Sequence, residues 1–208
     1  MSAKYFVPFN GNNTTDDPGT VLDSYKLKGF ELMKIKLKPS REQARHLMAF
    51  ALMLLAISVF YQFQVTRMFL YPFELISTVF HEFGHALMCI LTGGRVAAIE
   101  VNPNESGVTR FVGGIPCLIL PAGYLGSSLA GATLLILSFG EQSARAAAIG
   151  TGLVLLSTVF WAGTPFTAFS AILMILALAT AALKFPKLLR LLVLFMGTMG
   201  SLVSLLSI

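Results

Sequence analysis

The chain has 208 residues, of which 55% are hydrophobic and only 12% are charged. Soluble domains carry about 25% charged residues, so this composition excludes a disordered chain and argues against a soluble enzyme. The mean hydropathy of +0.76 predicts a protein that uses the lipid bilayer as part of its solvent. Its two cysteines, Cys89 and Cys117, lie in apolar sequence and are too few for a disulfide framework.

Residues 1–45 form a polar and basic N-terminal segment. Its basic side chains gather before the first long apolar run: Lys26, Lys28, Lys34, Lys36, Lys38, Arg41 and Arg45. Because Lys and Arg beside a membrane span stay in the cytoplasm, we expect a cytoplasmic N-terminus. We expect no cleaved secretory signal, since no apolar stretch comes first. No basic patch interleaved with aromatic residues indicates nucleic acid as a partner.

Six apolar runs are long enough to cross a hydrocarbon core of about 30 Å as helices. We expect these spans at residues 46–65, 68–91, 114–139, 144–161, 166–183 and 188–208. Residues 95–112 contain two β-type runs around the turn sequence Asn102-Pro-Asn-Glu-Ser-Gly107, which predicts a β-hairpin. The expected fold is an all-α multi-spanning membrane protein with about six transmembrane helices and a short β-hairpin after the second. Residues 46–208 would form one membrane-embedded domain.

Alternation of the spans from a cytoplasmic N-terminus places the hairpin inside and the connection between the fifth and sixth spans outside. That connection carries Lys184, Lys187 and Arg190, which conflicts with the preference of basic residues for the cytoplasm. The orientation of the last two spans therefore stays open.

Small residues in the third expected span predict close helix packing. Gly123, Gly126 and Gly131 carry no side chain, so neighbouring helices can approach this span closely.

The second expected span contains the sequence Phe80-His-Glu-Phe-Gly-His-Ala86. His81 and His85 are four residues apart, so on a helix both rings leave the same face and can bind one zinc ion. Zinc lowers the pKa of a bound water to about 7, and Glu82 can accept the proton of that water and pass it to the leaving amine. Ionisable groups at the centre of a span cost on the order of 3 kcal/mol each, which favours a metal site. The alternative is a structural polar cluster hydrogen-bonded between helices.

Four segments together resemble the site-2 protease class of intramembrane zinc metallopeptidases, and most closely its M-fifty-B-like branch. They are His81-Glu-Phe-Gly-His85, Leu91-Thr-Gly-Gly-Arg95, residues 99–109 and Leu120-Pro-Ala-Gly-Tyr-Leu-Gly126, within about a quarter of the chain. The resemblance implies zinc-dependent cleavage of membrane-protein substrates within or beside the lipid bilayer, with His81 and His85 as zinc ligands and Glu82 as general base. It also implies that the hairpin can bind an unwound substrate as an added strand.

The third zinc ligand is not evident in this sequence. A catalytic zinc site has three protein ligands and a water, and in the resembling class the third is typically an Asp on a later helix. No Asp follows Asp23 here. Cys89 shares the histidine face but would be a third ligand from one helix, Glu74 lies roughly 10 Å along the axis, and His46 opens the first span. We expect the ligand either beyond Ile208, since the chain ends in an apolar run, or to be absent.

Two functions therefore stay open. One is a zinc-dependent metalloendopeptidase, and the other is a catalytically inactive relative that acts as a membrane scaffold or chaperone. A metal carrier is a weaker hypothesis because the chain shows no internal repeat. Asn102 and Asn104 are either donors to an oxyanion or turn formers beside Pro103, and Tyr124 is either a donor or a packing residue.

Overall fold

The structure, a computed structural model, describes residues 26, 40–61 and 63–206. The chain divides into two compact units, Met1–Arg45 and His46–Ile208. Nearly all described residues belong to the second unit, and most of the expected N-terminal segment lies outside the described residues. A separate role for that segment stays a prediction.

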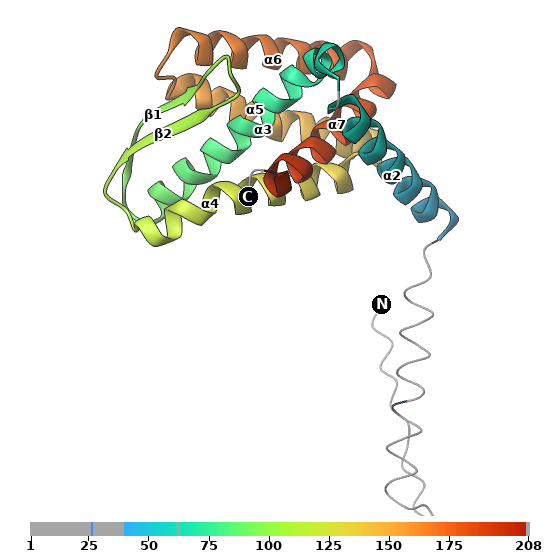
Figure 1. Ribbon diagram of the computed structural model, residues 1–208, viewed down its shortest axis with the longest axis horizontal. Helices are drawn as coiled ribbons and strands as arrows, with labels where there is room; N and C mark the ends of the chain where they lie inside the picture. Colours follow the sequence, from blue (N-terminus) through green and yellow to red (C-terminus); the bar gives the residue numbers. More distant parts are fainter. Residues whose placement is uncertain (1–25, 27–39, 62, 207–208) are drawn as a thin grey trace, which may run out of the picture. The chain divides into compact units, whose positions relative to one another are not determined.

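The described part of the second unit is mostly helical, with one two-stranded sheet (Figure 1). The elements in chain order are α2 (Arg41–Tyr61), α3 (Gln64–Leu91), β1 (Arg95–Val101), β2 (Gly107–Val112), α4 (Pro116–Leu137), α5 (Glu141–Phe160), α6 (Pro165–Lys184) and α7 (Pro186–Leu206). Each expected span coincides with one of these helices, and the predicted hairpin is confirmed at β1 and β2.

Four helices are long and apolar enough to cross a membrane: α2 over Gln43–Phe60, and α4, α5 and α6 over their whole lengths. Large apolar side chains such as Leu129, Leu153 and Leu176 are exposed on them, as expected for surfaces that face lipid. Among the described residues, α3 and α7 are not included in this group, so the predicted count of six spans is not confirmed.

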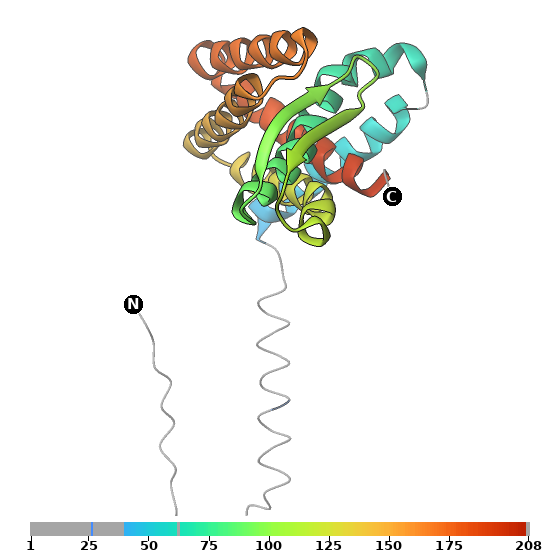
Figure 2. The same ribbon diagram turned by 90° about the vertical axis from the view of Figure 1, so that its left-hand side faces the viewer.

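The core lies between α3, α4, α5, α6 and α7. Helix α3 packs against α4 and α7, α4 packs against α7, and α5 packs against α6. Buried apolar side chains from all five helices meet there, including Val79, Leu134, Leu155, Met174 and Val193. A smaller cluster joins α2 to this core, with Ile57 against Leu70 and Met199. Figure 2 shows the hairpin in front of α3, which places both strands beside the helix that carries the histidines.

The connection between α6 and α7 lies beside the connection between α4 and α5. Arg190 of α7 donates hydrogen bonds to the carbonyl oxygens of Phe139, at 2.8 Å, and Ser138, at 3.4 Å. The two connections therefore share one end of the bundle, as alternation predicts. Ala49 of α2 lines one cavity with Lys187 and Arg190, so this part of α2 lies at the same end.

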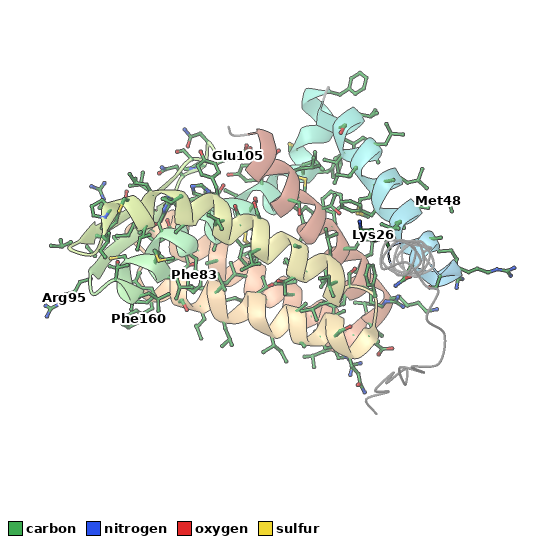
Figure 3. The ribbon with its side chains drawn as sticks, turned by 90° about the horizontal axis from the view of Figure 1, so that it is seen from below. Lys26, Met48, Phe83, Arg95, Glu105 and Phe160 are labelled. Atoms are coloured by element: carbon green, nitrogen blue, oxygen red, sulfur yellow. The ribbon has the colours of Figure 1, made fainter. Side chains whose placement is uncertain are left out.

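The start of the hairpin lies at the other end of the bundle, while its turn lies along α3. Figure 3 shows Met48 of α2 at one end, and Arg95 of β1 with Phe160 of α5 at the opposite end. The side of the membrane on which the N-terminus lies stays a prediction. Within the second unit, Thr198 of α7 lies 3.7 Å from the sulfur of Met53 on α2.

The hairpin is antiparallel, with Ile99 opposite Thr109 and a bulge between Val96 and Ala98. Its turn closes through the Asn102 N–H, which donates to the Ser106 carbonyl at 2.8 Å. The register matters for the site because it decides which residues of β2 face α3.

The outer edge of β1 is covered by the connection between α5 and α6. The Ile99 N–H donates to the Trp161 carbonyl at 2.7 Å, and the Gly163 N–H donates to the Ile99 carbonyl at 2.9 Å. Two residues on, the Val101 N–H donates to the buried Thr167 hydroxyl at 2.9 Å. These bonds leave β2 as the open edge of the sheet.

Candidate active site

The histidine motif lies in the C-terminal half of α3. The helix ends at Leu91, and the N–H of Gly93, at a φ of 82°, donates to the Ile90 carbonyl. A left-handed residue of this kind closes helix ends and favours glycine. Ahead of it, His81 and His85 lie one turn apart with both side chains half-buried.

The two imidazoles converge on one point. The Nε2 atoms of His81 and His85 lie 3.1 Å apart, with ring planes at 81°. On its other nitrogen, His85 Nδ1 lies 2.7 Å from the carbonyl oxygen of Ile119 on α4. A carbonyl only accepts, so Nδ1 carries the proton and Nε2 keeps its lone pair. Metal-binding histidines are oriented by such contacts.

Glycines bring α4 against this pair. A Cβ on Gly123 would contact Nε2 of both histidines, and a Cβ on Gly84 of α3 would contact the Ala122 carbonyl oxygen. One turn along α4, a Cβ on Gly126 would lie 3.0 Å from the Gly84 Cα. The predicted close approach to the third span is therefore confirmed for Gly123 and Gly126. It is also confirmed for Gly131, where a Cβ would lie 2.8 Å from the Ser201 nitrogen of α7.

The two imidazole nitrogens fit two ligands of a zinc ion. Zinc binds histidine nitrogen at about 2.0–2.1 Å with tetrahedral geometry, which puts two ligand nitrogens about 3.3 Å apart. The distance between the Nε2 atoms of His81 and His85 is close to this value. A Cβ on Gly123 would lie 2.6 Å from Nε2 of His81 and closer still to Nε2 of His85, so position 123 accepts no side chain without displacing the imidazoles.

The structure brings no third ligand to the pair within residues 26, 40–61 and 63–206. No group of three His, Cys, Asp or Glu side chains in that part of the chain is close enough to hold a metal ion. Neither Cys89 nor Glu74 joins the histidines, and the side chain of His46 lies outside the described residues.

Glu82 is enclosed by strand β2. Its side chain is only 5% exposed, and the Thr109 hydroxyl lies 2.7 Å from Oε2 and 2.9 Å from the Glu82 carbonyl oxygen. A Cβ on Gly107 would lie 2.5 Å from Oε1. The general base expected from the sequence is thus held between α3 and the hairpin, beside the histidine pair.

The other candidates have packing or turn roles. The Tyr124 ring meets the His81 ring edge to face, with centroids 4.6 Å apart. Asn102 donates to the Ser106 hydroxyl at 3.1 Å, and Asn104 accepts from that hydroxyl at 2.8 Å. These contacts favour the turn-forming interpretation of both asparagines.

Comparison with known proteins identifies the family. Residues 44–208 match the profile of the Peptidase M50B-like family. The chain belongs to this family. No curated protein and no solved structure matches it. The family supports a protease, and hence a hydrolase of site-2 protease type. Together with the four apolar helices, it indicates an integral membrane protein.

Sequence reasoning missed the partners of the motif. Thr109 and Gly107 lie within the resembling segment, yet nothing in their spacing shows that β2 would place them against Glu82. The Ile119 carbonyl has no sequence signal at all, because every residue carries one. The register of the hairpin and the crossing of α3 with α4 select these groups.

Proposed function

We propose that this protein is an intramembrane zinc metalloprotease that hydrolyses peptide bonds of membrane-protein substrates. The observation that carries the proposal is the convergence of the His81 and His85 Nε2 atoms, 3.1 Å apart, with Glu82 on the same turn of α3. The family match supports the same chemistry.

Each side chain of the site has a defined task in this proposal. His81 and His85 hold the zinc ion through Nε2, and the Ile119 carbonyl keeps His85 in the tautomer that binds. When bound, zinc polarises the scissile carbonyl and makes water nucleophilic near pH 7. Glu82 accepts the proton of the attacking water and passes it to the leaving amine.

The open edge of β2 is the proposed place for the substrate backbone. The N–H and C=O of Ile99 bond away from β2, and in an antiparallel pair the opposite residue then points its own groups outward too. Thr109 is that residue, and within the described residues no hydrogen bond uses its N–H or C=O on that side. We infer that an unwound substrate segment adds to β2 there, next to Glu82.

Cleavage can be tested with the full chain in liposomes. The probes are labelled synthetic peptides in which a Leu- and Ala-rich span is interrupted by a short Asn- and Gly-containing stretch, which unwinds easily. We expect cleavage by the wild type, loss upon chelation, and a fall of roughly 100-fold or more in E82Q. E82Q should keep its zinc, whereas H81A should lose it. Zinc-loaded wild type that cleaves no faster than E82Q would refute the proposal and support the inactive scaffold.

We also propose that the end of the bundle formed by the α4–α5 and α6–α7 connections faces the cytoplasm. Four basic residues lie there: Arg145, Lys184, Lys187 and Arg190. The early part of α2 lies at this end too, which supports a cytoplasmic N-terminus. The hairpin and the histidine site then lie toward the opposite side.

The two cysteines test this orientation without engineering. Cys117, at the start of α4, is exposed, while Cys89 is buried. A membrane-impermeant maleimide added to intact cells should label the wild type and not C117S. Labelling that requires permeabilised membranes would place the hairpin in the cytoplasm and overturn the proposal.

A further inference from the structure

Strand β2 encloses the Glu82 side chain on two sides. The Thr109 hydroxyl contacts Oε2 at 2.7 Å, and the Gly107 backbone lies so close to the other oxygen that a Cβ there would be 2.5 Å from Oε1 and 2.6 Å from Cγ. Residues 107 and 109 are two apart, so they project to the same face of the strand. One face of β2 therefore contacts both oxygens of one carboxylate.

The Thr109 hydroxyl has a single hydrogen and two acceptors on the same residue. Its oxygen lies 2.7 Å from Oε2 and 2.9 Å from the Glu82 carbonyl oxygen. A donor between these atoms ties the end of the side chain to its own backbone and restricts its rotation. An open glutamate side chain loses rotamer freedom only at a cost, so this contact prepares one orientation before substrate arrives.

The strand itself is fixed to α3 and to the rest of the bundle. Along one face of α3, the Tyr71 hydroxyl donates to the Pro103 carbonyl and the Thr78 hydroxyl donates to the Glu105 carbonyl, both at 2.9 Å. On the far side, Thr167 bonds to β1 at Val101. The hairpin is therefore attached along its length, and Thr109 is held where it meets Glu82.

We propose that Thr109 is a positioning residue for Glu82, with Gly107 as the position that must stay without a side chain. This inference rests on the proposed function, in which Glu82 is the general base. A proton acceptor works only in hydrogen-bond reach of its proton, so its orientation sets the rate of the chemical step. Thr109 contacts neither histidine in the described structure, which separates its effect from that of zinc binding.

The kinetic test compares T109V, which keeps the shape and removes the hydroxyl, with T109S, which keeps the hydroxyl. We expect the kcat of T109V for the interrupted-span peptides to fall about 10- to 100-fold, with KM and bound zinc unchanged, and T109S to recover most of the rate. G107A should also lower kcat, because its new methyl displaces Glu82. The controls are T180V on α6, where Thr180 bonds only to its own helix, and G150A, where a Cβ meets nothing within 4 Å.

A second measurement tests the contact without catalysis. Melting temperatures of T109V, E82M and the double variant form a cycle, and T180V with E82M forms the control cycle. If Thr109 and Glu82 stabilise each other, the double variant should melt at a higher temperature than the summed losses of melting temperature in the two single variants predict. The losses in the control pair should be additive.

The outcomes separate this inference from the proposed function. Any one of three results would overturn the positioning role: a wild-type kcat in T109V, a rate in T109S as low as in T109V, or an additive cycle. A different result would be equal cleavage by wild type and E82Q together with a non-additive cycle. It would refute the proteolytic mechanism and the catalytic role of the contact. The contact between Thr109 and Glu82 itself would still be supported.

Discussion

Glycines have opposite roles in two regions of this bundle. Where α3 crosses α4, Gly84 lies against the Ala122 carbonyl, and Gly123 lies against both imidazoles. In α5, a Cβ on Gly150 or Gly152 would meet nothing within 4 Å. In the first region glycine sets the distance between two helices, whereas in the second it contacts no neighbour.

The difference shows how the fold builds a site from an apolar helix. Only at the α3–α4 crossing do backbones come close enough for His85 to reach the Ile119 carbonyl at 2.7 Å. The same approach leaves no room for a side chain at position 123. Small residues therefore carry function here only where a neighbouring helix uses them.

The two glycine regions can be compared directly through the variants G123A and G150A. This pair should show the largest effect, and the effect is on zinc affinity. The new methyl of G123A would lie 2.6 Å from Nε2 of His81 and closer still to Nε2 of His85, and would displace both imidazoles. Zinc affinity should therefore fall at least about 100-fold, as for a disturbed ligand shell. Competition with a chromogenic chelator measures it on purified protein. G150A should bind zinc as the wild type does. Wild-type affinity in G123A would show that the contact of Gly123 with the imidazoles does not position them for zinc.

A smaller effect is expected from G84A against G152A, which compares stability rather than binding. The methyl of G84A overlaps backbone atoms of α4 and forces the helices apart, which costs about 1–3 kcal/mol. G152A should leave stability unchanged or raise it by up to about 1 kcal/mol, because alanine is the better helix former. Unfolding in denaturing detergent measures both. Equal stability of the two variants would remove glycine packing as the basis of the crossing.

The smallest effect concerns the hairpin beside the α5–α6 connection. Arg110 hydrogen-bonds Glu100 at 2.8 Å, and this lowers the pKa of the Glu100 carboxyl below its usual range. A lowered pKa in the folded state stabilises the protein fully above the unfolded pKa, and this stabilisation is lost as pH falls through the folded value. The wild type should therefore have a higher melting temperature than E100Q near neutral pH. This difference should shrink as the pH falls below the pKa of an ordinary glutamate.

Melting curves across a pH series measure that difference. R110Q is the matched control, because it breaks the same pair from the other side and should show the same loss at neutral pH. A difference between wild type and E100Q that grows toward acid would contradict the sign of the pKa shift.

Much of the architecture was predictable because its signals are local. Apolar runs longer than about 18 residues and the turn around Pro103 predicted the helices and the hairpin. The packing partners of α2 were not predictable in this way. Ile57 of α2 meets Leu70 of α3 and Met199 of α7, and Met199 lies far away in the sequence.

His81, Glu82 and His85 were evident from the sequence by themselves, because helical geometry alone puts residues four apart on one face. Only the tertiary structure decided what surrounds them: the Ile119 carbonyl, the Gly123 backbone against both imidazoles, and Thr109 against the carboxylate. These partners come from two other elements, α4 and β2, and their meeting depends on helix crossing and strand register. Both arise from packing over the whole chain, which no short stretch of sequence encodes.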